Sequence, residues 1–223
     1  SGRSALCAAF PFLKKSGIKT IFLPELICPS LPIFFKRFFE VKTYSENHIE
    51  TLSLKASEAI LFMDFFGASN QAEIEGWILK NPQTFSILDA TFAPFSEWAK
   101  NSAANCVFAS LRKLLPIPDG AYLKLKSEKP RKIAVLPSTS MPDFAGDILS
   151  AMTLKTLAKK AGGIEDKAYR KLFMKGEEKL FNSNAVCRIS PFSFEMLKKL
   201  DIPKILKNRV NMISDFEKSE NIK

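Results

Sequence analysis

The sequence predicts an α/β protein of three layers, in which a mostly parallel β-sheet is covered by helices on both faces. Two observations lead to this fold class. Short apolar segments typical of buried strands alternate with helical segments over roughly the first 125 residues. Several of these apolar segments end at a proline, a glycine or an aspartate, which favour turns. Strands without a polar face must be covered on both sides, so helices are expected above and below the sheet.

The first elements follow in order from the amino terminus. A helix is expected over residues 4–13, ended by Gly17, and Pro11 within it predicts a kink or an early end. A strand over residues 18–23 then stops at a proline. A second, apolar helix over residues 31–39 carries a proline near its first turn, where the missing N–H is tolerated.

The rest of the predicted sheet comes from short apolar segments. Strands are expected over residues 59–66, 85–88, 106–109 and 121–125. Ser69 or Asn70 begins a helix that runs to Ile78, with Glu73 three residues after Asn70 as in a capping box. In parallel sheets, ligands bind beyond the carboxyl ends of the strands, so polar residues that follow these strands are candidates for a site.

The character of the sequence changes after residue 125. Residues 126–144 are rich in proline, serine and lysine, which is typical of a loop or crossover. Amphipathic helices are expected after it, over residues 145–160, 165–181, 191–199 and 202–216.

Composition limits the classes of function. The chain has 223 residues, 46% of them hydrophobic, so it has enough apolar residues for a core and is not a disordered protein. We expect no membrane span and no signal peptide, and therefore a cytoplasmic protein. The net charge of +10 is concentrated in lysine-rich helices of the second half. These could attract polyanions, but the absence of interleaved aromatic residues favours solvated helix faces, so neither nucleic acid nor membrane is expected as a partner.

Cysteine and histidine usage argues against metal chemistry. The four cysteines form no CxxC pair, and we expect them to be reduced thiols. Because His48 is the single histidine, a metal site built on imidazoles is not expected, and any Ser-His-Asp triad would have to use it.

Three motifs can carry chemistry, and each has an ordinary structural alternative. The segment SGRSAL places a glycine at a helix start, where backbone N–H groups bind phosphate, although an ordinary helix cap looks the same. Asp89 ends the strand FSILD, where it either meets a ligand or caps a turn. Ser110 and Lys113 follow the next strand in SLRKLLPIPDGA, and Lys113 is either a reactive amine or an exposed lysine.

Taken in order, these motifs resemble the sugar aminotransferases of the DegT/DnrJ/EryC family, which are pyridoxal-phosphate-dependent enzymes of fold type I. The matching segments are SGRSAL, LPELICPS, AILFMDFFG, SILDATFAPFS and VFASLRKLLPIPDGAYL. The resemblance continues more faintly through KAYRKLF, RISPFSFEMLKKLDI and KNRVNMI. It implies a cofactor-binding large domain over residues 1–144, and a helical linker with the start of a smaller domain over residues 145–223. Family members carry more chain at both ends, so this sequence is either a divergent, minimal member or part of a longer one.

The resemblance also implies roles for individual residues. Lys113 would hold pyridoxal 5′-phosphate as a Schiff-base lysine and move protons, and Asp89 would pair with the pyridine nitrogen. The helix start at Gly2, Arg3 and Ser4 would bind the cofactor's phosphate through backbone N–H groups and a hydroxyl, with the hydroxyl of Ser110 beside them.

Two further cofactor contacts depart from the family's pattern. Cys28 stands where members often have an aromatic residue stacked on the cofactor ring. Two to three residues beyond the aspartate, members usually have a small residue and then Gln or His, where this chain has Thr91 and Phe92.

The activity implied by the resemblance is transfer of an amino group from glutamate to a keto sugar linked to a nucleotide, in the biosynthesis of sugars or surface polysaccharides. A homodimer with active sites at the subunit interface is also implied. Two alternatives remain: a pyridoxal-phosphate enzyme with another reaction, such as a dehydration or an aldol cleavage, and a catalytically degenerate relative that serves as a binding module.

Overall fold

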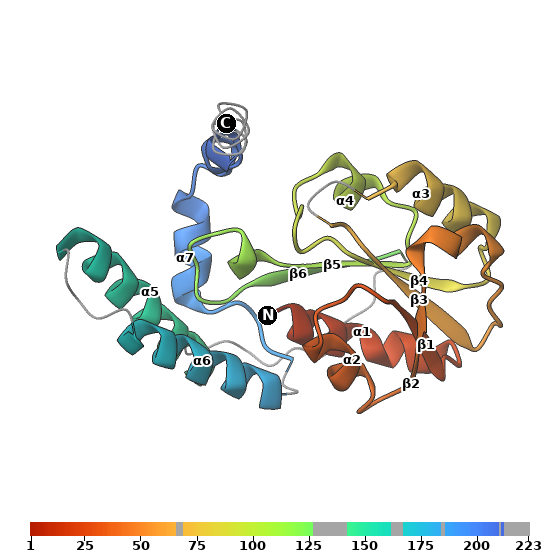
Figure 1. Ribbon diagram of the computed structural model, residues 1–223, viewed down its shortest axis with the longest axis horizontal. Helices are drawn as coiled ribbons and strands as arrows, with labels where there is room; N and C mark the ends of the chain where they lie inside the picture. Colours follow the sequence, from red (N-terminus) through yellow and green to blue (C-terminus); the bar gives the residue numbers. More distant parts are fainter. Residues whose placement is uncertain (66–68, 127–141, 162–166, 184–185, 210, 212–223) are drawn as a thin grey trace, which may run out of the picture.

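A computed structural model of the chain shows a six-stranded sheet between layers of helices (Figure 1). The structure describes residues 1–65, 69–126, 142–161, 167–183, 186–209 and 211. The strands are β1 (Thr20–Pro24), β2 (Glu40–Tyr44), β3 (Glu58–Met63), β4 (Phe85–Asp89), β5 (Cys106–Ser110) and β6 (Ala121–Leu125). They lie in the order β2-β1-β3-β4-β5-β6, and all neighbours are parallel except β5 and β6. The predicted fold class, a mostly parallel sheet with helices on both faces, is confirmed.

One face of the sheet is covered by α1 (Gly2–Lys15) and α2 (Ser30–Phe35). Phe10 of α1 lies among the phenylalanines of α2 and the turn after it, with ring centroids 4.9 Å from Phe38 and 5.1 Å from Phe39. Beneath these rings pack the side chains of β3 that point to this face, among them Leu61. The cluster is wholly apolar, so burial of its surface fixes α1 against the sheet.

The opposite face is covered by α3 (Gln71–Lys80) and α4 (Glu97–Asn101). The alternate side chains of the strands, such as Ile60 and Phe62 of β3, pack there against Trp77 and Trp98. Because successive strand residues point to opposite faces, the continuous apolar runs in the sequence supply both cores.

The predicted elements were largely confirmed, with some differences. Helix α1 does not end at Pro11 but continues to Lys15, because the exposed proline lies on the solvent side of the helix. Gly17 follows that helix with φ of 77°, as a left-handed residue after a helix end requires. The predicted helix over residues 31–39 is shorter, and strand β2 was not predicted at all. Its burial pattern is mostly exposed, so it lacks the apolar run by which the other strands were identified.

The carboxyl-terminal part is helical, as predicted, with α5 (Asp143–Ala161), α6 (Lys167–Asn182), α7 (Pro191–Lys199) and a helical segment over residues 202–209. Helices α5 and α6 pack side by side (Figure 1). Gly176 of α6 allows this approach, since an added Cβ would lie 2.8 Å from the side chain of Ile148. Most of the predicted loop over residues 126–144 lies outside the described residues.

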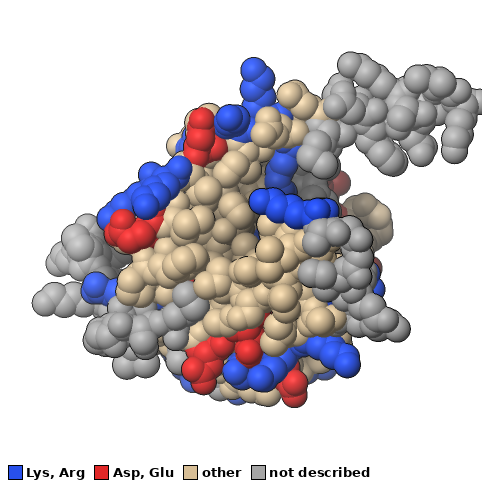
Figure 2. Space-filling model, turned by 90° about the vertical axis from the view of Figure 1, so that its left-hand side faces the viewer, with Lys and Arg blue, Asp and Glu red and all other residues tan. Residues whose placement is uncertain are grey.

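At this helical end of the molecule, lysine and arginine side chains lie beside acidic ones around a broad uncharged surface (Figure 2). Among the described lysines, Lys179 of α6 pairs with Asp147 of α5 at 2.7 Å. Within the described parts of the chain, no helix combines the length and apolar character that crossing a membrane requires.

A buried carboxylate joins the two parts of the chain. Asp119, in the turn before β6, is 2% exposed and accepts hydrogen bonds from the backbone N–H of Ser190 (2.8 Å) and its hydroxyl (2.6 Å). It also accepts one from the hydroxyl of Ser193. Ser190 is the N-cap residue of α7, and its hydroxyl in turn accepts the N–H of Ser193, so the carboxylate holds the residue that caps this helix. Helix α7 is thereby fixed to the turn that follows Lys113.

We expect Asp119→Ala to lower the free energy of unfolding by about 3 kcal/mol, because it leaves a buried N–H and two hydroxyls without their acceptor. Chemical denaturation monitored by circular dichroism measures the change. The control is Asp201→Ala, which removes an exposed carboxylate that accepts from the N–H of Lys204 and is expected to cost about 1 kcal/mol. Equal losses in the two variants would contradict a special role for the buried network.

Candidate functional site

A cavity of about 470 Å³ lies at the carboxyl ends of four parallel strands. It is lined by residues that follow β1, by the ends of β3, β4 and β5, by the start of α1 and by α6. Both its place in the sheet and its size are typical of ligand sites in α/β proteins. Of the residues predicted for the site, the cavity brings together Gly2, Arg3, Cys28, Asp89, Thr91, Ser110 and Lys113.

The start of α1 forms one wall of this cavity. Ser1 is the N-cap residue, and its hydroxyl accepts a hydrogen bond from the N–H of Ser4 at 3.2 Å. The first turn leaves the N–H groups of Gly2 and Arg3 without an intrahelical acceptor. Gly2 also packs closely on β5, since an added Cβ would lie 3.2 Å from the Cβ of Ser110. The helix start and the end of β5 are therefore in contact, as a shared anion site requires.

The prediction for Ser4 is not supported by its position. Ser4 is not among the residues that line the cavity, and its N–H and hydroxyl both interact with the hydroxyl of Ser1. The helix begins two residues earlier than the sequence pattern predicted, so Ser1 takes the place at the cavity that was assigned to Ser4.

Asp89 lies on the floor of the cavity and is 4% exposed. One of its carboxylate oxygens accepts the N–H of Thr91 at 2.9 Å, and the hydroxyl of Thr91 accepts the N–H of Ser110 at 3.1 Å. Burial raises the pKa of Asp89 to about 6, against the smaller opposing effect of the Thr91 hydrogen bonds. A buried carboxylate of this kind is stabilised in its ionised form by a cationic ligand group beside it.

Lys113 lies in the short 3₁₀ helix η2 (Leu111–Lys113) that follows β5, and its side chain lines the cavity. The sequence left Lys113 as either a reactive amine or an exposed lysine, and the structure shows a residue that is exposed and also lines the cavity. Lys113 therefore lies at the rim, where the cavity opens to solvent. Ser110, by contrast, is buried at 7% exposure at the end of β5.

Cys28 lines the cavity on the side formed by the segment after β1. Its thiol lies 3.2 Å from the hydroxyl of Ser30. Burial alone would raise the pKa of Cys28, but the hydrogen bonds of Ser30 and the positive charges of Lys113 and Arg3 outweigh it and lower the pKa. A small polarisable thiol thus occupies the position where the resemblance implies an aromatic ring.

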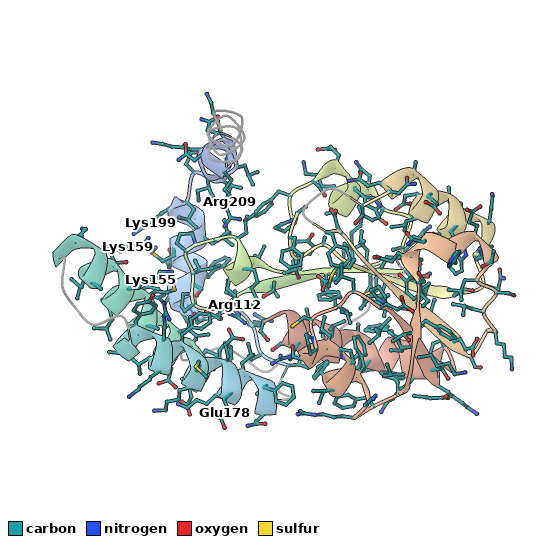
Figure 3. All side chains as sticks on the ribbon, in the orientation of Figure 1. Arg112, Lys155, Lys159, Glu178, Lys199 and Arg209 are labelled. Carbon is teal, nitrogen blue, oxygen red and sulfur yellow. The ribbon has the colours of Figure 1, made fainter. Side chains whose placement is uncertain are left out.

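Sequence reasoning missed the contribution of α6. Glu177 and Leu180 of this helix line the cavity, and Glu177 forms a bidentate ion pair with Arg112 of η2, with distances of 2.6 and 3.0 Å. Figure 3 shows Arg112 between the sheet and the helical end of the molecule. Arg112 could have been suspected because it precedes Lys113. Glu177 could not, since it lies 65 residues away in the sequence and resembles any other charge on an amphipathic helix.

The described residues fit pyridoxal 5′-phosphate. The helix start at Gly2, in contact with Ser110, suits a phosphate, and the space beside Gly2 would be reduced by any Cβ. The buried carboxylate of Asp89 suits a protonated pyridine nitrogen, and the amine of Lys113 at the rim suits the cofactor's aldehyde. The roles of these residues remain predictions.

No family model matches the sequence. No curated protein matches it either.

Several solved structures are similar in fold. An L-threonine-O-3-phosphate decarboxylase from Porphyromonas gingivalis is 14% identical with a TM-score of 0.44, over 56% of this chain and 42% of that one. An aromatic-amino-acid aminotransferase from Burkholderia pseudomallei, covalently bound to pyridoxal phosphate, is 15% identical with a TM-score of 0.42, over 80% and 54%. An archaeal O-phosphoseryl-tRNA(Sec) selenium transferase is 18% identical with a TM-score of 0.39, over 54% and 33%.

The chain thus spans 33% to 54% of the length of these proteins. At this level of identity and TM-score, the similarity concerns the fold and carries no inference about activity.

Proposed function

We propose that this chain is a pyridoxal-phosphate-dependent aminotransferase. One observation carries the proposal: Gly2, Asp89, Ser110 and Lys113, which are spread over 112 residues of sequence, line one cavity at the carboxyl ends of the parallel strands. Each residue type alone is common in such positions. A helix start that can bind phosphate, a buried carboxylate and a lysine together in a cavity of this size suit this cofactor.

Each residue has a defined role in the proposal. The N–H groups of Gly2 and Arg3 and the hydroxyl of Ser110 hold the phosphate. Asp89 keeps a proton on the ring nitrogen, and bound pyridoxal phosphate then supplies an electron sink for a carbanion at the substrate. The Nζ of Lys113 would hold the cofactor at its aldehyde and, as a free amine, would move the proton on the substrate's α-carbon. The apolar wall, which includes Met63 and Phe108, excludes water.

The substrate part of the proposal rests on the sequence motifs. The order of five segments that resemble the DegT/DnrJ/EryC family supports glutamate as the amino donor and a nucleotide-linked keto sugar as the acceptor. The same resemblance supports a cytoplasmic homodimer with the cavity at the subunit interface. The exposure of Lys113 is consistent with that arrangement, because a rim that opens to solvent in one chain is available for a second one to cover.

Absorbance spectroscopy of the purified protein tests the cofactor. We expect added pyridoxal 5′-phosphate to give a visible band that survives gel filtration and shifts to shorter wavelength when glutamate is added. A band that forms but does not respond to glutamate would favour a different reaction, such as a dehydration. No band at all at saturating cofactor would contradict the proposal and favour a degenerate binding module.

A further inference from the structure

Among the residues that line the cavity, the positively charged side chains near α1 outnumber the negatively charged ones. Arg3, Arg112 and Lys113 line this part, with Glu177 as the acidic residue among them, while Asp89 lies on the floor. The Nη1 of Arg3 and the Nε of Arg112 are buried and make no hydrogen bond within the described parts of the chain. Buried donors on a guanidinium are costly to leave unpaired, so two of them at one cavity indicate an anionic ligand group.

In the structure, the carboxylate of Glu177 takes one of the positions at which these guanidinium groups would bind an anion. Its carboxylate faces Arg112 in the forked arrangement that guanidinium groups form with carboxylates and phosphates. The side chain of Arg112 is 6% exposed, whereas that of Glu177 is 30% exposed. The arginine is therefore the more deeply buried partner. The Oε1 of Glu177 is also buried, and it makes no hydrogen bond within the described parts of the chain, so an oxyanion that pairs better with Arg112 can replace the glutamate without leaving the arginine unpaired.

Helix α6, which carries Glu177, is fixed to the same wall by its end. Two guanidinium groups contact the ring of Phe181, with Arg3 at 4.9 Å and Arg37 at 4.6 Å from its centroid. Arg37 also donates a hydrogen bond to the carbonyl oxygen of Phe181 at 3.1 Å. These contacts orient Arg3 beside Glu177 and keep the backbone of α6 in place, so an exchange at Arg112 needs only the glutamate side chain to turn away.

We propose that Arg3 and Arg112 form a substrate subsite for an oxyanion group, a carboxylate or a phosphate, and that Glu177 is its built-in competitor. The subsite deepens the proposed function, on which its role toward a substrate rests: both the amino donor and a nucleotide-linked acceptor carry such a group. It is separate from the cofactor's phosphate site, which uses the backbone N–H groups of Gly2 and Arg3, whereas the subsite uses guanidinium side chains. When no ligand is bound, Glu177 pairs with Arg112 in the subsite, and only a substrate with an oxyanion group displaces the glutamate.

Titration calorimetry with inorganic phosphate, and separately with glutarate, tests the subsite on both cofactor-free and cofactor-loaded protein at fixed ionic strength. We expect Glu177→Gln to raise the affinity for both anions by about tenfold, since the competing charge is removed. Arg3→Gln should lower it by about tenfold relative to the wild type, and the double variant Arg112→Gln/Glu177→Gln should lower it by about tenfold relative to Glu177→Gln. The double variant replaces the whole buried pair, so it avoids an unpaired buried charge.

Glu178→Gln is the matched control, because it makes the same change on the same helix at an exposed position that does not line the cavity (Figure 3). Equal affinities in Glu177→Gln and Glu178→Gln would overturn the subsite. Loss of phosphate and glutarate binding on cofactor loading would also overturn it, and would assign the guanidinium groups to the cofactor instead. Failure of the cofactor to bind sinks the proposed function, and the titrations on cofactor-free protein then still decide whether Glu177 competes with anions.

Discussion

Replacement of Lys113 by alanine is expected to abolish the visible cofactor band and to lower amino transfer by about 10⁴-fold. Without this side chain, no amine at the cavity's rim holds the cofactor's aldehyde, and no base lies there to move the substrate's α-proton. The measurement is an absorbance titration with pyridoxal 5′-phosphate, followed by an assay of 2-oxoglutarate formed from glutamate.

Lys80→Ala controls for the loss of one positive charge, because Lys80 is an exposed lysine at the end of α3 and does not line the cavity. It should behave as the wild type in both assays. A normal band and normal turnover in Lys113→Ala would show that the lysine has another role. We do not expect the fold to change, since the exposed Lys113 contributes little burial.

Asp89→Asn should lower the rate strongly, because it is expected to cost several kcal/mol of transition-state stabilisation. A neutral amide cannot keep the pyridine nitrogen protonated, and each unit of pKa lost by that nitrogen corresponds to about 1.4 kcal/mol. The expected result is a cofactor band that still forms, with a greatly lowered kcat. A wild-type rate would mean that Asp89 serves only as a turn residue that accepts the N–H of Thr91.

The same substitution should stabilise the cofactor-free protein at neutral pH. Burial raises the pKa of Asp89 from its ordinary value of 3.8 to about 6, so the folded state binds the proton more tightly than the unfolded state. Stability therefore falls as pH rises through this window, by about 3 kcal/mol in all, and the asparagine variant escapes that loss. Urea denaturation at pH 4 and pH 7 should show that the free energy of unfolding of the variant, relative to that of the wild type, is higher at pH 7. A difference that does not change with pH would contradict the raised pKa.

Much of the fold followed from the sequence because its signals are local. The buried strands β3, β4 and β5 are continuous apolar runs, and Asn70 and Glu73 mark the start of α3 by their spacing. Strand β2 was missed because three of its five residues are exposed, and only pairing with β1 makes it a strand. Pro11 misled the prediction because the sequence does not say which side of a helix faces solvent.

The site could be predicted only in part, for the same reason. Asp89 and Lys113 were identified because each follows a recognisable strand. Ser4 was assigned to the cavity because the sequence does not fix the first residue of α1; in the structure Ser1 caps the helix and accepts the N–H of Ser4. Glu177 and the exposure of Lys113 depend on how distant parts of the chain pack, and no local pattern records that.

The order of events in folding follows from the position of α1. This helix is first in the chain, yet it packs against β5 and β6, which are the last strands of the sheet. The antiparallel pair β5–β6 and the segment carrying Lys113 between them are local in sequence and can form early, whereas closure of Gly2 onto Ser110 spans more than a hundred residues. Phe10 of α1 can pack early on the phenylalanines that follow it closely in sequence, but the contact of Gly2 with Ser110 needs β5 to be in place. The wall of the cavity at Gly2 is therefore the part whose completion depends on the most distant contact in sequence.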